Sequence, residues 1–160
     1  NFVEGGLPRY NRPDRLLQRG DIVLTSSAHA PRYIAKKIDI ITSMPDWVGG
    51  RASFVGEVMA LRPKRGVDPF RLLAYLRLDD VMNSLQGLIR GQTAHLHPED
   101  VLQLPMRDDL WNAPELTTTM VELVTKEAAL NDDLNELARR QIEAQARLCG
   151  NVPADLKRAS

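Results

Sequence analysis

The sequence predicts an α+β protein, in which a small twisted sheet with short helices is followed by one long helix of the coiled-coil type. Short β-branched and apolar runs bounded by Gly and Pro are typical of the strands of a small sheet. Residues 115–148 contain no Gly or Pro and repeat apolar residues at spacings of four and three, which is typical of a coiled coil. We therefore expect a body over residues 1–112, a long helix over 113–148 and a tail over 149–160.

Three runs of the first half predict the strands. The first is residues 20–27 (GDIVLTSS), which is apolar and β-branched and is entered through a glycine. The second is residues 33–41 (YIAKKIDII), which contains a pair of lysines. The third is residues 53–64, which we expect to be a buried strand that stops at Pro63, with Gly56 at a bulge or a close approach of two backbones.

Capped starts predict three short helices after these strands. Asp68 can cap the free N–H groups of the first helix. Asp79 opens the second helix, which Gly91 can end in a left-handed conformation. Pro98 opens the third, and acids occupy its first turn, where the helix dipole favours them. Residues 102–106 then complete the body as a short strand or extended segment.

The C-terminal helix carries an apolar seam. A helix of about 33 residues is roughly 50 Å long, whereas a body of about 110 residues has a radius of gyration near 13 Å. We therefore expect the helix to project beyond its body and to assemble with a second helix; the alternative is a helix folded back on its own domain. The predicted assembly positions are Leu116, Met120, Leu123, Leu130, Leu134, Leu137 and Leu148.

The charge of the chain is unevenly distributed, although the net charge is zero. Residues 1–90 hold 14 Lys and Arg against 9 Asp and Glu, a net of +5, and residues 91–160 hold 7 against 12, a net of −5. Such asymmetry favours a body that faces a polyanion and an acidic part with another task. Chance together with an acidic helix is the alternative explanation.

The cysteine count and the hydropathy limit the cellular compartments in which the protein is expected. Cys149 is the one cysteine, so an internal disulfide framework is excluded. No apolar run approaches the roughly 18 residues of a membrane span, and the N-terminus lacks the apolar region of a signal peptide. We expect a cytoplasmic protein. Because the chain begins with Asn1, we expect it to be a piece of something longer.

Two histidines raise the question of a metal site. His95 and His97 alternate as neighbours on a strand would, so both side chains can point the same way. Zinc takes about four ligands, or three with a water, and the remaining histidine is His29. Glu99 and Asp100 are possible ligands, but their place in a first helical turn already accounts for them. We therefore expect no metal site.

A serine hydrolase is the other catalytic possibility. Ser26, Ser27 and His29 lie close together, and acids are plentiful. However, the chain has no G-x-S-x-G elbow and no helix directly after the serines. The glycine motifs that bind nucleotide phosphates are also absent. We expect a chain that is not an enzyme and needs no cofactor, and a small hydrolase built on this Ser/His loop stays as an alternative.

Basic residues flank the loops of the first half. They are Arg32, Lys36, Lys37 and Arg51, and hydroxyl and aromatic residues stand among them. Arg and Lys bind phosphates or the guanine edge, and serine can reach base edges. The alternative is an ordinary solvated face of the protein.

In order, these pieces resemble the target recognition domain of the specificity subunits of type I restriction–modification systems. Members carry a Gly-Asp-Ile-Leu strand, an Arg-Pro-Lys, an Asp-Pro before a Leu/Tyr-rich helix, a Gly-Ser/Thr-type turn and a short helix leading into Ile-Pro-Leu-Pro. The matching segments here are residues 20–24, 62–64, 68–76, 91–93 and 104–106. The resemblance covers about residues 16–148, and five weak elements in the right order make it fairly specific.

The resemblance implies a non-catalytic module that recognises a specific sequence of duplex DNA. Its implied partner is an N6-adenine DNA methyltransferase, and in full systems a translocating endonuclease. A specificity subunit has two recognition domains and two spacer helices, so one of each suggests a half-length protein that dimerises or the C-terminal piece of a fused methyltransferase. A protein-interaction adaptor without DNA specificity is a further alternative. The implied DNA contacts are Ser26, Ser27, His29, Arg32, Lys36, Lys37, Arg51, Gln92 and Thr93.

Under this resemblance, residues 88–106 form a joint: a helix end, a turn, a capped helix and a return to the sheet. We expect the histidines there to do no chemistry.

Overall fold

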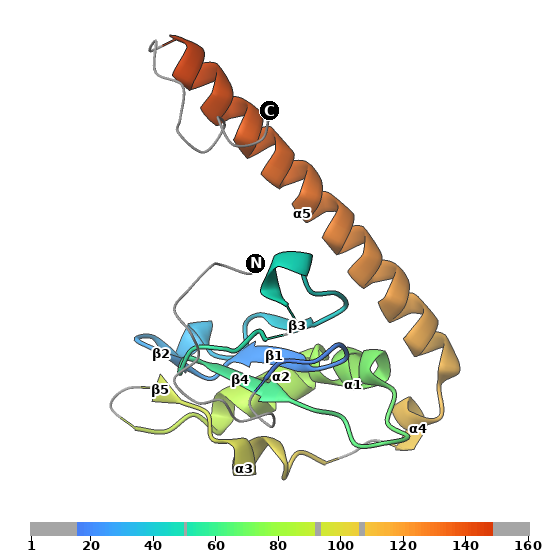
Figure 1. Ribbon diagram of the computed structural model, residues 1–160. Helices are drawn as coiled ribbons and strands as arrows, with labels where there is room; N and C mark the ends of the chain where they lie inside the picture. Colours follow the sequence, from blue (N-terminus) through green and yellow to red (C-terminus); the bar gives the residue numbers. More distant parts are fainter. Residues whose placement is uncertain (1–15, 50, 92–93, 106–107, 149–160) are drawn as a thin grey trace. The chain divides into compact units, whose positions relative to one another are not determined.

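The computed structural model describes residues 16–49, 51–91, 94–105 and 108–148 (Figure 1). The fold is α+β, with small antiparallel sheets, short helices and a long C-terminal helix, as the sequence predicted. By its contacts the chain divides into two units, Asn1–Met120 and Val121–Ser160. The first unit holds both sheets and the short helices, and the second consists, in its described part, of the long helix.

The larger sheet has three antiparallel strands in the order β3-β1-β4. The central strand β1 is Ile22–Thr25, and its neighbours are β3, Ile38–Ile40, and β4, Val58–Leu61. Ile22 of β1 pairs with Ile40 on one side and with Leu61 on the other. Along β1 buried and half-buried residues alternate, as they do on a strand with one face in the core.

A second, two-stranded ribbon pairs β2, Ser27–Ala28, with β5, Ala94–His95. The pairing is antiparallel, with Ser27 opposite His95 and Ala28 opposite Ala94. The backbone N–H of Leu96 donates to the carbonyl of Ser26 at 2.8 Å and lengthens the ribbon. The ribbon therefore joins the end of β1 to a segment about seventy positions later in the chain.

The short helices begin where their caps and first turns predict. In α1, Pro69–Leu76, the Asp68 carboxylate accepts a hydrogen bond from the backbone N–H of Arg71 at 2.9 Å. The second helix, α2, is Asp79–Gly87, so the predicted end at Gly91 is wrong, and the C-cap is Leu88. The third helix, α3, is Pro98–Val101. A further short helix, α4, spans Asp108–Trp111.

The core of the first unit lies between the three-stranded sheet and α1 and α2, which lie beside it in Figure 1. Apolar side chains from both layers are removed from water there, and such burial contributes about 25 cal/mol per Å². The largest fully buried apolar side chains are Ile22, Leu24, Ile34, Leu73, Leu76 and Leu85.

Three predicted details of the strands are wrong. Residues 33–41 do not form one strand, because a 3₁₀ turn, Pro31–Tyr33, and a left-handed Ala35 (φ 52°) bend the chain before β3. Gly56 lies in a turn before β4, and a Cβ there would meet nothing within 4 Å, so no backbone approaches it closely. Residues 102–105 form turns and a bend, because backbone bonds such as Leu104 N–H to Val101 C=O keep the chain turning after α3.

The long helix α5 is continuous over Pro114–Leu148, a length of 35 residues. Its first turns belong to the first unit, where Met120 is buried. The sulfur of Met120 lies 4.0 Å from Nη1 of Arg77. The exposed part of the seam therefore begins at Leu123. None of the helices in the described part of the chain combines the length and the apolar character that a membrane span requires.

Candidate nucleic-acid interface

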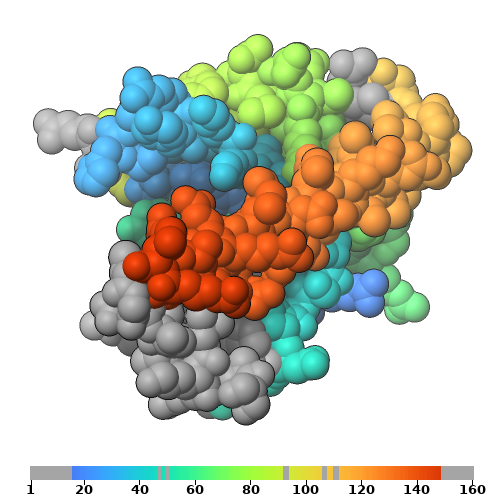
Figure 2. Space-filling model, turned by 90° about the horizontal axis from the view of Figure 1, so that it is seen from above, coloured from blue at the N-terminus to red at the C-terminus, as the bar shows by residue number. Residues whose placement is uncertain are grey.

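The segment between β2 and β3 presents a group of exposed cations. Arg32, Lys36 and Lys37 are exposed there, together with the aromatic ring of Tyr33, and we call these four residues the basic loop. The segment that carries them, blue to cyan in Figure 2, lies at the surface of the molecule. Within the described residues none of the three cations forms an ion pair with a carboxylate, so their charge faces solvent.

The backbone of the basic loop is held by two fully buried residues, Ile34 and Ala35. The N–H of Ala35 donates to the carbonyl of Thr25 in β1 at 2.8 Å. The side-chain amide of Gln86 in α2 donates to the carbonyl of Ile34. Buried backbone groups with partners resist displacement, so the loop is fixed to both the sheet and α2 at its midpoint.

Tyr33 brings two of the cations together. The guanidinium carbon of Arg32 lies 4.9 Å from the ring centroid, and Nη2 of Arg32 donates to the Tyr33 hydroxyl at 3.1 Å. Nζ of Lys36 lies 5.9 Å from the same centroid. Cations over an aromatic face are attracted by its quadrupole, which offsets part of the repulsion between two like charges on one small surface.

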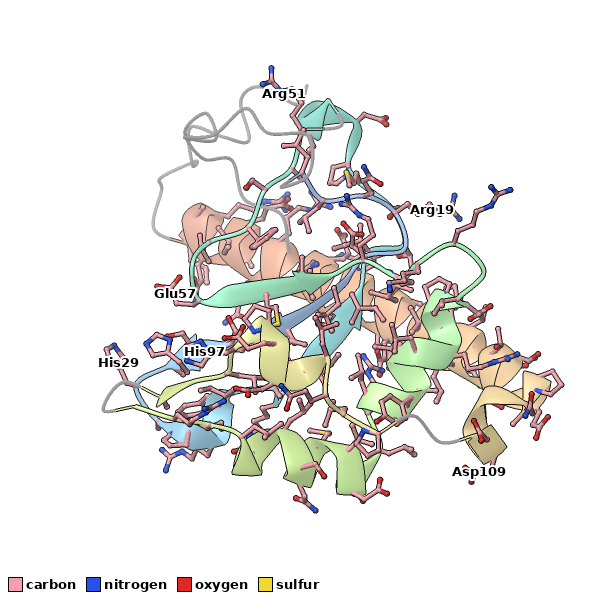
Figure 3. The ribbon with its side chains drawn as sticks, turned by 90° about the horizontal axis from the view of Figure 1, so that it is seen from below. Arg19, His29, Arg51, Glu57, His97 and Asp109 are labelled. Carbon is pink, nitrogen blue, oxygen red and sulfur yellow. The ribbon has the colours of Figure 1, made fainter. Side chains whose placement is uncertain are left out.

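Histidines line the ribbon beside the basic loop. Along β5 and the residues after it, Ala94 and Leu96 are buried while His95 and His97 are exposed. The two imidazole centroids are 6.4 Å apart. His29 follows β2 and is also exposed, and Figure 3 shows it at the same edge of the first unit as His97. The described residues include no group of three or more His, Cys, Asp or Glu side chains placed to hold a metal ion.

The stretch that follows α2 is held as a joint by backbone and side-chain contacts. Arg90 and His95 exchange two backbone hydrogen bonds, each 3.0 Å long, and Gly91, directly after Arg90, is left-handed (φ 92°). The guanidinium of Arg90 also pairs with the carboxylate of Asp100, which is buried in α3. The hydrogen bond to Asp100 and the attraction of its charge raise the pKa of Arg90. Arg90 thus bonds both to β5, through its backbone, and to α3, through its side chain.

The structure brings only some of the predicted contact residues together. His29, Arg32, Lys36 and Lys37 all lie in the segment between β2 and β3 and are exposed. Ser26 is buried, and its backbone N–H donates to the carbonyl of Glu57 at 2.8 Å, so its place is in the junction of β1 and β2 rather than at the surface.

Ser27, Arg51 and the pair Gln92 and Thr93 lie differently. Ser27 is half-buried in the ribbon, opposite His95. Arg51 extends from the loop before β4, well away from His29 and His97 in Figure 3. Gln92 and Thr93 lie outside the described residues. Tyr33 was not among the predicted contacts, although an aromatic residue beside a cation was the signal that could have singled it out.

The described part of the second unit presents a different surface, made of leucines. The side chains of Leu130, Leu134 and Leu137 are 63%, 62% and 61% exposed. Leucines at this spacing lie on one face of a helix, so α5 carries an exposed apolar stripe. Leu123 and Leu148 are exposed on the same stripe.

Charged residues beside this stripe form a network along the helix. Arg139 donates to Glu136 through Nε and Nη2, both at 2.9 Å, and to Glu143 through Nη1 at 2.7 Å. Nε of Arg140 donates to Glu136 at 2.7 Å. The hydrogen bonds from Arg139 and Arg140 lower the pKa of Glu136 from its ordinary 4.5 to about 2.

No model of a known protein family matches the sequence, and a search of the curated proteins finds no match to it.

Proposed function

We propose that this chain recognises duplex DNA and that the basic loop is its primary contact with the phosphate backbone. The single observation that carries the proposal is the presentation of Arg32, Lys36 and Lys37 on a loop whose midpoint is buried and hydrogen-bonded. Cations held in place lose little freedom on binding, whereas cations on a flexible segment must be ordered first. The excess of positive charge in residues 1–90 supports the same partner.

The energetic basis of such binding is counterion release. Each phosphate that a lysine or arginine neutralises frees condensed cations, so the logarithm of the binding constant falls with the logarithm of salt concentration by about 0.9 per contact. The three exposed cations of the basic loop can therefore supply a salt slope of up to roughly three. Tyr33 adds a ring that holds the Arg32 guanidinium in place.

The biological setting that we propose rests on the resemblance to specificity subunits. The chain would act in the cytoplasm as the recognition module of a restriction–modification system, and it would direct a partner or fused N6-adenine methyltransferase to its site. In this proposal the chain carries no chemistry of its own. Incubation of the purified chain with labelled S-adenosylmethionine and plasmid DNA should therefore leave the DNA unlabelled, and clear incorporation would contradict the proposal.

The exposed leucines of α5 support a second element of the proposal, namely assembly through the helix. A stripe of leucines at 4-3 spacing is the surface that a partner helix covers in a coiled coil. The occupant is the helix of a second copy of the chain or of the methyltransferase partner. The same stripe favours the adaptor alternative, which becomes the better one if the chain does not bind DNA.

The binding experiment compares two double variants that remove equal charge. Lys36→Ala with Lys37→Ala removes two cations from the basic loop. Lys64→Ala with Arg65→Ala removes two exposed cations from the turn after β4. The turn after β4 lies at the end of the sheet where Leu61 is opposite Ile22 at the start of β1. The basic loop follows β1 and β2 and so lies at the other end, where Val58 is opposite Thr25.

Fluorescence anisotropy with random-sequence duplexes at several salt concentrations gives both affinity and salt slope. We expect the basic-loop variant to weaken binding to all sequences alike and to reduce the salt slope by up to about two. The control variant should keep nearly the whole slope of the parent. Equal effects of the two variants, or binding by the basic-loop variant as tight as that of the parent across the salt range, would show that this loop does not face DNA.

A further inference from the structure

All three histidines of the chain lie on or directly beside the β2–β5 ribbon. Ser27 and His95 are directly opposite each other, so their side chains share one face of the ribbon. His97 stands two positions beyond His95 and is in extended conformation (φ −94°, ψ 145°), so it returns to the same face. His29 lies in the bend directly after β2, two positions beyond Ser27, and is exposed. We call these four residues the histidine face.

The orientation of this face is fixed by what lies behind it. Ala94 and Leu96, the residues that alternate with the histidines, are both 3% exposed and anchor the opposite face in the core. The N–H of Leu96 donates to Ser26 on one side of β5, and His95 exchanges its backbone bonds with Arg90 on the other. A slip by one residue would bury the imidazoles and expose the apolar residues, so the histidines are held outward.

The imidazoles of the histidine face have hydrogen-bonding groups to offer. Within the described residues none of the three rings donates or accepts a hydrogen bond. A neutral imidazole carries one N–H donor and one acceptor nitrogen, and a protonated one carries two donors. Two rings with centroids 6.4 Å apart therefore present donors to a ligand whose acceptors are repeated along its length.

We propose that the histidine face enters the major groove of duplex DNA and reads purines, with His95 and His97 donating to N7 acceptors. This inference rests on the proposed DNA-binding function and adds to it the element that confers sequence preference. The major groove is about 12 Å wide and admits a two-stranded ribbon. Purine N7 is an acceptor exposed in that groove for both adenine and guanine.

The position of the ribbon beside the basic loop supports the assignment. His29 and Arg32 are three positions apart, so a ribbon seated in the groove brings the cations of the basic loop towards the flanking phosphates. Phosphate contacts set position and orientation, and base contacts set sequence. In this assignment the basic loop contributes affinity through phosphates, and the histidine face contributes sequence preference through bases.

The test begins with selection of preferred duplexes from a random library by the parent chain. Each purine of the selected site is then replaced by its 7-deaza analogue, which lacks the N7 acceptor and leaves the pairing edge intact. The proteins compared are the parent, the variant with His95→Ala and His97→Ala, and a control with Asn83→Ala, an exposed polar residue on α2. Thermal melting checks that each variant folds. If the alanine variant does not fold, His95→Gln with His97→Gln replaces it, because Gln keeps a hydrogen-bonding side chain at each position.

For the parent and the Asn83 control we expect one or two 7-deaza substitutions to weaken binding by roughly 3- to 10-fold, the effect of one lost hydrogen bond. For the histidine variant the same substitutions should have no further effect, because the interaction is already lost. Binding of that variant to random duplexes should stay within about twofold of the parent, because phosphate contacts carry non-specific affinity.

Three results would overturn the inference. If the histidine variant selects the same sequence and keeps the 7-deaza effect, other residues read the site, while the proposed function stands. If the parent binds duplex DNA with a salt slope but selects no sequence, the histidine face confers no preference. If the parent binds no duplex DNA at all, the proposed function fails, and the inference fails with it.

Discussion

Asp21 and Arg62, 41 positions apart in the sequence, form a bidentate ion pair. Nε of Arg62 donates to one carboxylate oxygen at 2.8 Å and Nη2 donates to the other at 2.7 Å. The carboxylate of Asp21 also accepts from the N–H of Gln18, and Nη2 of Arg62 also donates to the carbonyl of Leu16. The residues therefore clamp the start of β1 to the end of β4.

The first prediction is that Asp21→Asn destabilises the protein by about 2 kcal/mol. The substitution removes the charge from a buried group that accepts three hydrogen bonds, and bonds to charged groups contribute about 1.5–3 kcal/mol. The effect is smaller than for a fully buried pair because the Arg62 side chain is 40% exposed and can be hydrated. Urea denaturation of parent and variant measures the difference in free energy of unfolding.

The matched control for this clamp is Asp39→Asn. Asp39 pairs with Arg77 at 2.9 Å, but its side chain is 61% exposed. An exposed pair contributes about 0–1 kcal/mol, so the control should cost less than half as much. Equal losses at the two positions would contradict a special role for the Asp21–Arg62 pair.

The second prediction is that Asp100→Asn loosens the backbone of the histidine face. Arg90 then loses the charged partner that holds it while its backbone bridges His95. Hydrogen exchange should show faster exchange at the N–H of His95, by roughly tenfold if the local opening becomes about 1.4 kcal/mol easier. The N–H of Ile41, which donates to the backbone carbonyl of Asp21 at 2.8 Å, serves as the internal control and should change little. Unchanged exchange at His95 would mean that the ion pair does not support the ribbon.

The third prediction is that Leu130→Lys with Leu134→Lys abolishes assembly through α5. Both leucines are more than half exposed in the isolated chain and would be covered in a coiled coil, where the two lysines would be desolvated. Sedimentation or light scattering should show the mass of a single chain for the variant and a larger mass for the parent, alone or with its partner.

The control for the third prediction adds the same charge to another face of the helix. Ala128 and Asn135 are exposed and, seven positions apart, lie off the leucine stripe. Changing both to Lys should leave the mass of the assembly unchanged. If the leucine variant and this control assemble alike, the stripe is not an interface.

The fourth prediction concerns the dependence of α5 on pH. Because the folded-state pKa of Glu136 is lowered to about 2, its interactions with Arg139 and Arg140 stabilise the helix above the ordinary value of 4.5. That stabilisation is lost as the pH falls from about 4.5 to about 2. Far-ultraviolet circular dichroism of the parent and of Glu136→Gln should differ at pH 7 and converge at the low end of this range.

Salt and a second carboxylate test the cause of this effect. High salt should reduce the difference at pH 7, because the network is at the surface. Glu122→Gln, which changes another exposed carboxylate of the same helix, should show no such convergence. A difference between parent and Glu136→Gln that persists unchanged to pH 2 would contradict the ionic explanation.

Local signals predicted much of the fold, because they act over a few residues. The Asp68 cap and the long uninterrupted helix appear where the sequence indicated, whereas Gly91 is left-handed but lies after the end of α2 rather than ending it. Strand extents were less predictable, because they depend on pairing with distant segments. Nothing in residues 33–41 indicates that Ala35 is left-handed; that conformation accompanies its hydrogen bond to Thr25.

The candidate site was predictable in composition and less so in arrangement. The exposed positions of Arg32, Lys36 and Lys37 agree with a basic face of the first half. The separation of Arg51 from His29 in Figure 3 depends on the path of the loop before β4, which no local pattern determines. The common face of Ser27 and His95 depends on a strand register between segments about seventy positions apart.

The Asp21–Arg62 clamp and the basic loop lie at opposite ends of the four-residue strand β1. The residues that keep the sheet together are thus different from those that face the proposed ligand. Substitutions of the exposed residues Arg32, Lys36 and Lys37 should therefore leave the clamp intact, because the buried places of Ile34 and Ala35 do not depend on those side chains. Such a separation would let the residues at the ligand-facing end of β1 diverge while the scaffold is inherited unchanged.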